Sequence, residues 1–261
     1  MLLSIIVIVL RETLEASVLI SIMLSLTHCR KLPTSWLYPA LLSGLTGAGI
    51  YALSLGWISE QFDYVGQEVL NASLQYLIYV LLVIVCAMQY LGGTRHTRHL
   101  PLFMALTVAI ALVREGGELV VFYSGFLQGN TSLTSAVTSG FIGLALGLSA
   151  GVVFYYGVIL LPEIEVRRTL TLLLSLIACG MVLQATQLLI QADWLPTNQP
   201  LWDSNELLAE NSIAGQIAYA IFGYESRPSV VEISFYLVAM ATVFVAIKAA
   251  KKYTSKQPAS L

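Results

Sequence analysis

The stretch IVLRETLEAS, residues 7–16, places three charged side chains inside an otherwise apolar segment. In a helix, Glu12 and Glu15 lie on one face because they are three residues apart, and Arg11 reaches Glu15 four residues along. A charged group at the centre of a bilayer costs about 2.5–3.5 kcal/mol on insertion scales. If this segment crosses a membrane, its charges must pair with one another and face the protein interior.

A second stretch, LVREGGELVV at residues 112–121, repeats the pattern Arg-Glu-x-x-Glu at an offset of 103 residues. Its charged residues are Arg114, Glu115 and Glu118, again within an apolar segment. The same spacing pairs Arg114 with Glu118 and puts both carboxylates on one helix face. Two such motifs favour a shared site over two separate ion pairs that merely lock helices together.

The composition identifies a membrane protein. Hydrophobic residues make up 57% of the chain and charged residues 11%, whereas soluble domains carry about 25% charged residues. The first apolar run lacks a basic leader, so we expect it to be retained as a span. The three cysteines form no C-x-x-C pair, which argues against a disulfide framework or a cysteine metal site. The expected surrounding is a lipid bilayer, and no nucleic-acid partner is expected.

Seven apolar segments are long enough to cross a hydrocarbon core of about 30 Å at about 1.5 Å per residue. We therefore predict an all-α polytopic membrane protein with seven transmembrane helices. The predicted spans are 2–27, 36–58, 69–92, 100–125, 133–161, 169–191 and 229–248.

The distribution of basic residues predicts the orientation, because Lys and Arg collect in cytoplasmic loops. Ten of the 13 basic residues fall in alternate connections and in the tail. They are Arg30, Lys31, Arg95, Arg98, Arg167, Arg168, Lys248, Lys251, Lys252 and Lys256. The other connections hold most of the acids. We expect a protein of the inner (cytoplasmic) membrane with its N-terminus outside and its C-terminus in the cytoplasm.

The two motifs also indicate an internal repeat. At the motif offset, Gly44 corresponds to Gly147 and Ala48 to Gly151, within stripes of small residues that let helices approach closely. A unit of three spans crosses the membrane an odd number of times, so its second copy is inserted upside down, as in many transporters. The predicted parts are repeats at 1–99 and 100–191, an outer loop at 192–228, and a seventh helix with a basic tail at 229–261.

The outer loop contains a predicted amphipathic helix. Asp203 followed by Glu206 matches a capping box that opens a helix, and Gly223 closes it before Pro228. The sequence leaves open whether this helix lies against the outer membrane face and the mouth of the bundle or is an ordinary solvated loop helix.

Facing one another, the two motifs combine four carboxylates and two guanidinium groups into a cage with a net charge of about −2. Carboxylate oxygens with residual negative charge suit a hard, highly charged cation. No His or Cys lies near either motif, which disfavours a soft-metal or typical zinc site. The predicted metal ligands are Glu12, Glu15, Glu115 and Glu118, oriented by Arg11 and Arg114.

Two Arg-Glu-x-x-Glu motifs, in spans one and four of a seven-span chain, resemble the oxidase-dependent high-affinity iron permease family, including its bacterial EfeU-type branch. The stretch IFGYESRPSVVEI, residues 221–233, is similar to that branch. The resemblance implies that the chain is a transporter and not an enzyme. It implies that the substrate is an iron ion, Fe³⁺ or Fe²⁺, most simply ferric iron after oxidation outside. An extracytoplasmic iron oxidase or iron-delivery protein is the partner that it implies.

This chain departs from the family pattern Arg-Glu-Gly-Leu-Glu. Thr13 replaces the glycine of the first motif, and Gly117 replaces the leucine of the second. Since the charged positions are kept, we expect the site to survive with altered helix packing. In QEVLNA, residues 67–72, Asn71 stands where the family has an acid, which leaves Glu68 alone and puts an auxiliary outer metal site in doubt.

Polar side chains outline a route from the outer side. They are Gln184, Gln187 and Gln191 on one face of span six, with Gln75 and Glu68 in span three. Buried amides serve equally well as contacts between helices.

Two alternatives to iron transport stay open. A transporter of manganese or lead would use the same carboxylates, and a membrane di-iron enzyme is disfavoured because no span offers a Glu-x-x-His spacing.

Overall fold

The structure is a computed structural model that describes residues 2–91, 94–127, 133–196, 199–210 and 212–256. Within these ranges the regular structure is helical, with eight α-helices and one short 3₁₀ helix. The elements are α1 (Leu2–Cys29), η1 (Thr34–Trp36), α2 (Leu37–Ser59), α3 (Gly66–Met88), α4 (Thr94–Leu127), α5 (Leu133–Ile159), α6 (Glu163–Gln191), α7 (Ile213–Phe222) and α8 (Val230–Lys256).

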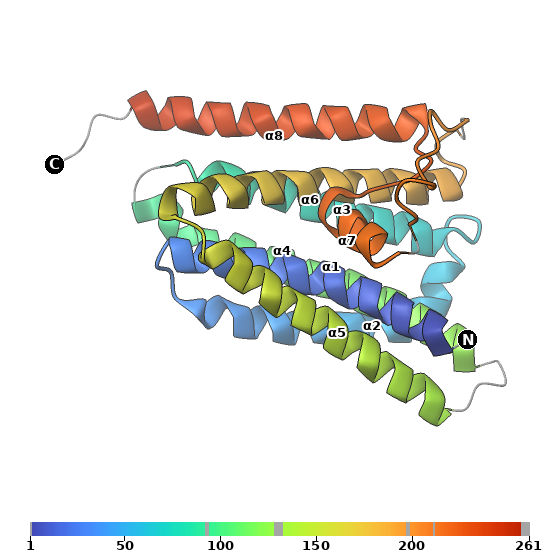
Figure 1. Cartoon of the computed structure of the whole chain (residues 1–261). Coiled ribbons are helices and arrows are strands. Elements are labelled where there is room, and N and C mark those ends of the chain that lie inside the picture. The colour runs from blue at the N-terminus through green and yellow to red at the C-terminus, as the bar shows by residue number, and fades with distance from the viewer. Residues whose placement is uncertain (1, 92–93, 128–132, 197–198, 211, 257–261) are drawn as a thin grey trace.

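The long helices form one bundle in which consecutive helices run in opposite directions, while the short α7 lies beside α1 and α6 (Figure 1). The chain enters the bundle at one end with α1 and leaves it at the other end with α8 (Figure 1). Five segments of the described chain are long and apolar enough to cross a membrane: 34–59, 66–88, 134–159, 165–191 and 230–255. The helices α1 and α4 are 28 and 34 residues long and carry the charged motifs. The architecture is that of a polytopic membrane protein.

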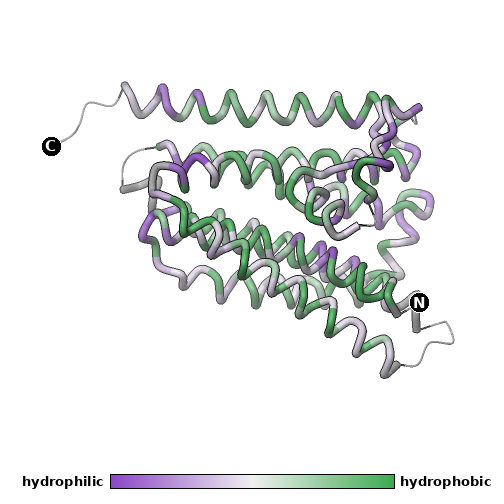
Figure 2. Tube along the Cα trace, in the orientation of Figure 1, coloured by the Kyte–Doolittle hydropathy of each residue, from purple (hydrophilic) through white to green (hydrophobic). Residues whose placement is uncertain are grey.

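The first motif forms a hydrophilic stretch part-way along α1, flanked by apolar turns (Figure 2). Since lipid offers no hydrogen-bonding partner, such a stretch must be covered by other helices. Accordingly, Glu12 and Glu15 are buried, with residue exposures of 5% and 4%.

Small residues bring the helices of the bundle close together. Helix α1 lies along α5, α2 lies along α4, and α3 lies along α6. A Cβ built on Gly147 of α5 would lie 2.7 Å from the Cβ of Thr13 in α1, and one built on Gly44 of α2 would lie 2.7 Å from the Cβ of Leu112 in α4. Ser17 also donates a hydrogen bond to the carbonyl of Gly147 (2.9 Å). Neither glycine leaves room for a side chain.

Each motif helix contacts a small residue of a neighbouring helix. Thr13 and Gly116 hold equivalent positions in the two motifs, 103 residues apart. In the structure Thr13 meets Gly147, whereas Gly116 meets Ala48. The two contact residues, Ala48 and Gly147, are 99 residues apart, whereas the two motifs are 103 residues apart.

The helix of the outer loop begins later than its sequence suggests. The oxygen Oδ1 of Asp203 accepts a hydrogen bond from the backbone N–H of Asn205 (3.0 Å) in a local turn, and no helix begins there. Ser212 is the N-cap of α7 and accepts from the N–H of Gly215 (3.0 Å). The predicted helix start is therefore wrong, because a short turn satisfies Asp203 locally.

The predicted end of this helix is confirmed. Gly223 caps α7 with φ of 65°, the left-handed region that favours glycine. Its Cα also approaches Gly180 of α6 so closely that a Cβ on Gly223 would lie 2.5 Å from the Cα of Gly180. Gly180 is in the middle of α6, and α7 also contacts α1. Helix α7 is thus packed into the bundle and is not a solvated loop helix.

Candidate metal centre

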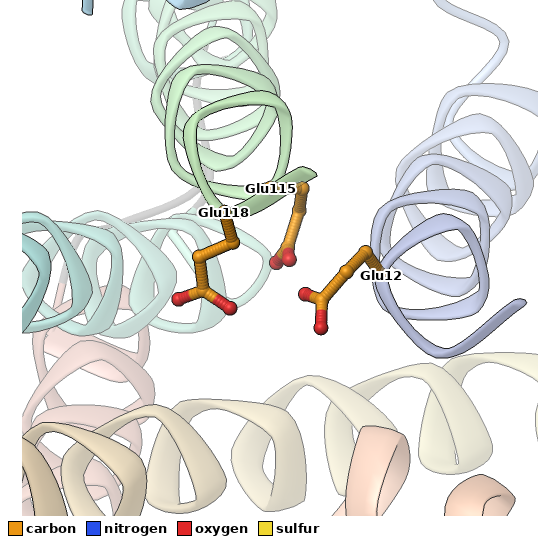
Figure 3. A group of neighbouring side chains, drawn as sticks. All are labelled: Glu12, Glu115 and Glu118. Atoms are coloured by element: carbon orange, nitrogen blue, oxygen red, sulfur yellow. The ribbon is translucent and has the colours of Figure 1, made fainter. Parts of the chain in front are cut away.

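Three of the predicted ligands come together between α1 and α4. Glu12, Glu115 and Glu118 each offer a carboxylate oxygen, and these oxygens lie within 4.8 Å of one another. Figure 3 shows the three side chains extending toward a common space, Glu12 from α1 and the other two from α4. Glu12 and Glu115 are buried, while the side chain of Glu118 is 25% exposed. The arrangement can supply several oxygen ligands to one cation.

Arg114 is the central cation of this group. Its Nη1 lies 2.6 Å from Oε1 of Glu115 and 2.9 Å from Oε2 of Glu15, and its Nη2 lies 2.9 Å from Oε1 of Glu118. The predicted pairing of Arg114 with Glu118 is confirmed. Glu15 lies outside the group of three, and Arg114 engages its carboxylate from the other helix.

Arg11 occupies the equivalent position in α1 with a different environment. Its Nε lies 3.5 Å from Glu15, the predicted partner, and 3.9 Å from Glu12. Its guanidinium lies 4.0 Å from the ring centroid of Tyr219 in α7, a cation–π contact. The side chain is 35% exposed, against 3% for Arg114. The two motifs are therefore alike in sequence and unlike in structure.

The site keeps acceptors that no protein donor uses. Oε2 of Glu12 and Oε2 of Glu115 are buried without a hydrogen-bond partner. Buried polar atoms are almost always paired, so each exception calls for an explanation. Carboxylate oxygens that face a common space without a donor are suited to a cation.

A cavity of about 440 Å³ leads to this group. One water molecule takes about 30 Å³ in the liquid, so the cavity has room for a hydrated cation. Its lining includes Arg11, Gln75, Arg114, Glu118, Gln184, Gln187, Gln191, Glu210, Gln216, Tyr219, Glu225 and Glu232. All four predicted pathway glutamines are among them, whereas Glu68, half-buried in the first turn of α3, is not. Glu118 belongs both to the cavity wall and to the group of three.

The lining of the cavity also includes an acidic pair, Glu210 and Glu225, that the sequence did not reveal. Gln187 donates to Oε2 of Glu225, and the backbone N–H of Ser226 donates to Oε1 of Glu210 (2.7 Å). Burial, together with the charge of Glu210, raises the pKa of Glu225 to about 7. Burial also acts to raise the pKa of Glu210, but the hydrogen bonds from Ser226 outweigh it and the pKa is lowered. At neutral pH this pair presents negative charge toward the cavity.

Comparison with known proteins identifies the family. Residues 2–251 match the model of the iron permease FTR1 family. The chain belongs to this family. It is 24% identical over 259 residues to a protein named ferrous iron permease EfeU from Escherichia coli O6:H1 (strain CFT073), covering 92% of each chain. Proteins of the same name from Shigella flexneri and Yersinia pestis are 26% and 24% identical over 55% and 53% of this chain, which spans 61% and 49% of theirs. No solved structure matches.

Family membership makes the chain a membrane transporter of the iron permease class, and the structure explains how it accommodates its departures from the family pattern. Thr13 packs on Gly147, and a Cβ built on Gly117 would lie 2.7 Å from the ring of Tyr51. The Tyr51 ring therefore occupies the space that a leucine at position 117 would need. Tyr51 donates to Oδ1 of Asn71 (3.3 Å), and Nδ2 of Asn71 approaches Oε1 of Glu118 (3.5 Å). Asn71 thus contacts Glu118, a member of the group of three carboxylates, although the sequence suggested only the loss of an outer acid.

The sequence analysis did not place the residues of α7 and its flanking loop at the site, although Glu225 lies in the family-like stretch 221–233. Tyr219, Gln216 and Glu225 lie in the outer loop and reach the cavity only because α7 packs against α1 and α6. The amphipathic pattern of this segment was a further signal, because it places Gln216 and Tyr219 three residues apart on one helix face.

Proposed function

We propose that this iron permease binds iron at a site in the middle of the bundle and releases it toward the cytoplasm. Glu12, Glu115 and Glu118 receive the ion, and Glu15 completes the four-glutamate site when Arg114 changes partner. The observation that carries this proposal is the group of three carboxylates with two buried, unpartnered oxygens, in a chain of the iron permease family. Carboxylate oxygens are the ligands that hard cations prefer.

Arg11 and Arg114 orient these carboxylates before the ion arrives. The three contacts of Arg114, all between 2.6 and 2.9 Å, hold Glu15, Glu115 and Glu118 in place and offset their repulsion. When a cation binds, it takes over that role, and the guanidinium groups turn to other partners. Two arginines and four glutamates leave a net charge of about −2, which attracts a multivalent cation into the bundle.

The transmembrane arrangement that we propose has seven spans, with α1–α3 and α4–α6 as inverted repeats and α8 as an addition. The contacts between helices support it. In the proposed repeat, the first helix of each unit packs on the second helix of the other unit, α1 on α5 and α4 on α2. Helices in the same position of the two units also pack on each other, α3 on α6 and α1 on α4. A two-fold relation between the repeats requires such a pattern. In this arrangement the N-terminus faces outward and the basic ends of the helices face the cytoplasm, across the inner membrane.

Iron enters from the outer end through the cavity, passes the glutamines of α6 and reaches Glu118 first, since this acid lines the cavity. Rocking of one repeat against the other then opens the site inward. We propose ferric iron as the substrate, supplied by an outer oxidase or delivery protein, because a site of carboxylates alone favours the harder ion. The names of the relatives specify ferrous iron, so the test must compare both oxidation states.

Uptake of radioactive iron in cells tests this function. Glu12→Gln and Glu118→Gln should each lower the uptake rate at least about tenfold, in the range seen when metal sites lose supporting groups. Glu206→Gln is the matched control, because Glu206 is exposed in the outer loop. Parallel arms supply ferric citrate or iron kept reduced with ascorbate, and excess manganese or lead tests for another metal. Wild-type uptake by both site variants at normal expression would refute the proposal.

A further inference from the structure

Two buried glutamines join α3 to α6 beside the metal centre. Nε2 of Gln75 donates to Oε1 of Gln184 (2.8 Å), and Nε2 of Gln184 donates to Oε2 of Glu15 (3.4 Å). Gln75 is 0% exposed and Gln184 is 3% exposed. Both side chains line the cavity that leads to the three carboxylates.

The orientation of each amide in the hydrogen-bonded series Gln75–Gln184–Glu15 is fixed by the carboxylate of Glu15. Oε2 of Glu15 lies 2.9 Å from the guanidinium of Arg114 and can only accept hydrogen bonds. Gln184 must therefore present its NH₂ group to Glu15, which leaves its carbonyl oxygen facing Gln75. For the same reason Gln75 must present its NH₂ group to Gln184. Neither amide can be reversed without placing two acceptors or two donors against each other.

This constraint leaves one oxygen without a protein donor. Oε1 of Gln75 is buried and has no hydrogen-bond partner. Gln75 shares the cavity wall with Glu118, a member of the carboxylate group. An amide carbonyl is a neutral oxygen ligand that hard cations accept alongside carboxylates.

We propose that Gln75 coordinates the transported cation through Oε1, and that Gln184 and Glu15 are positioning residues which aim that oxygen. This role rests on the proposed function, because it assumes that the cation reaches the carboxylate group through this cavity. In this role Gln75 is a neutral oxygen ligand, and the carboxylates supply the negative charge that balances the cation. The ligand class is a hard cation carrying part of its hydration shell.

The test measures cation binding to the purified full-length protein in detergent. The probes are Fe²⁺ under anaerobic reducing conditions and Ga³⁺, which is a redox-inert trivalent ion, each titrated calorimetrically. Gln75→Leu should raise the dissociation constant about tenfold, as for other groups that support a metal site. Gln75→Glu should bind more tightly than Gln75→Leu and about as tightly as the wild type, because a carboxylate oxygen replaces the amide oxygen even though the hydrogen bond to Gln184 is lost. Gln89→Leu is the matched control: it removes another buried glutamine after the same helix, outside the cavity.

The two variants separate coordination from helix contact. If Gln75 only joins helices, Gln75→Glu must fail with Gln75→Leu, since a carboxylate cannot donate to Gln184. That result overturns the inference. A second result also overturns it: Gln75→Leu keeps the wild-type dissociation constant and melts at the same temperature as Gln89→Leu. Should Gln75→Leu fail to fold, Gln75→Glu alone decides: binding close to that of the wild type supports the role, and a dissociation constant raised about tenfold or more removes it. Absence of cation binding by the wild type overturns the proposed function together with this inference, whereas the other outcomes leave that function standing.

Discussion

Replacing Arg114 by glutamine removes the cation that holds the two motifs together. The side chain is 3% exposed and lies within 2.9 Å of carboxylates from Glu15, Glu115 and Glu118. Removing one partner of a buried ion pair costs about 3–5 kcal/mol, because the remaining charges lose their compensation. For a chain of this size, each 1 kcal/mol corresponds to about 2–4 °C in melting temperature. We therefore expect Arg114→Gln to melt about 6–20 °C below the wild type.

The matched control is the same substitution in the other motif. Arg11 is 35% exposed, and its contacts with Glu15 and Glu12 are 3.5 and 3.9 Å long. Such an ion pair contributes at most about 1 kcal/mol, and its contact with Tyr219 adds about 1 kcal/mol. Arg11→Gln should thus melt only about 2–8 °C below the wild type. Thermal unfolding of both proteins in the same detergent, followed by size-exclusion chromatography, measures the difference. Equal falls in melting temperature for the two variants would show that Arg114 is not the central cation of the carboxylate group.

Two other perturbations test the packing and the outer acidic pair. Gly147→Leu should destabilise the folded protein by about 1–3 kcal/mol or more, because α1 leaves no room for a side chain. The control Gly49→Leu should melt like the wild type, because nothing lies within 4 Å of a Cβ built there. Equal melting temperatures for both variants would contradict the close approach of α1 and α5. The pKa of Glu225 is raised from 4.5 to about 7, so between these pH values the folded state holds a proton that the unfolded state has lost. Stability from this group is therefore present at low pH and falls as pH rises through that window. Melting curves against pH should show a smaller fall for Glu225→Gln than for the wild type, and identical slopes would exclude the effect.

The sequence located the long helices well, and their ends less well. Helix α4 begins at Thr94 where the prediction began at 100, and α8 ends at Lys256 where the prediction ended at 248. Apolarity marks the part of a helix that crosses the bilayer, whereas backbone hydrogen bonds carry the helix on into polar turns. For this reason hydropathy finds spans and underestimates helices.

Pairing within each motif followed from helix geometry alone, so the contacts of Arg11 with Glu15 and of Arg114 with Glu118 were predictable. Contacts between motifs were not, because they depend on how far α1 and α4 are rotated and shifted against each other. The sequence shows two equal motifs, but packing gives the central place to Arg114. It also withdraws Glu15 from the group of three. The role of Tyr219 depends likewise on the position of α7, which no local pattern determines.

The most direct test of the central claim is anomalous diffraction at the iron absorption edge from crystals of the protein grown with iron. We expect an iron peak between the carboxylates of Glu12, Glu115 and Glu118, at bonding distance from their oxygens. Iron found only at the outer pair, Glu210 and Glu225, with no peak between the three carboxylates, would contradict it.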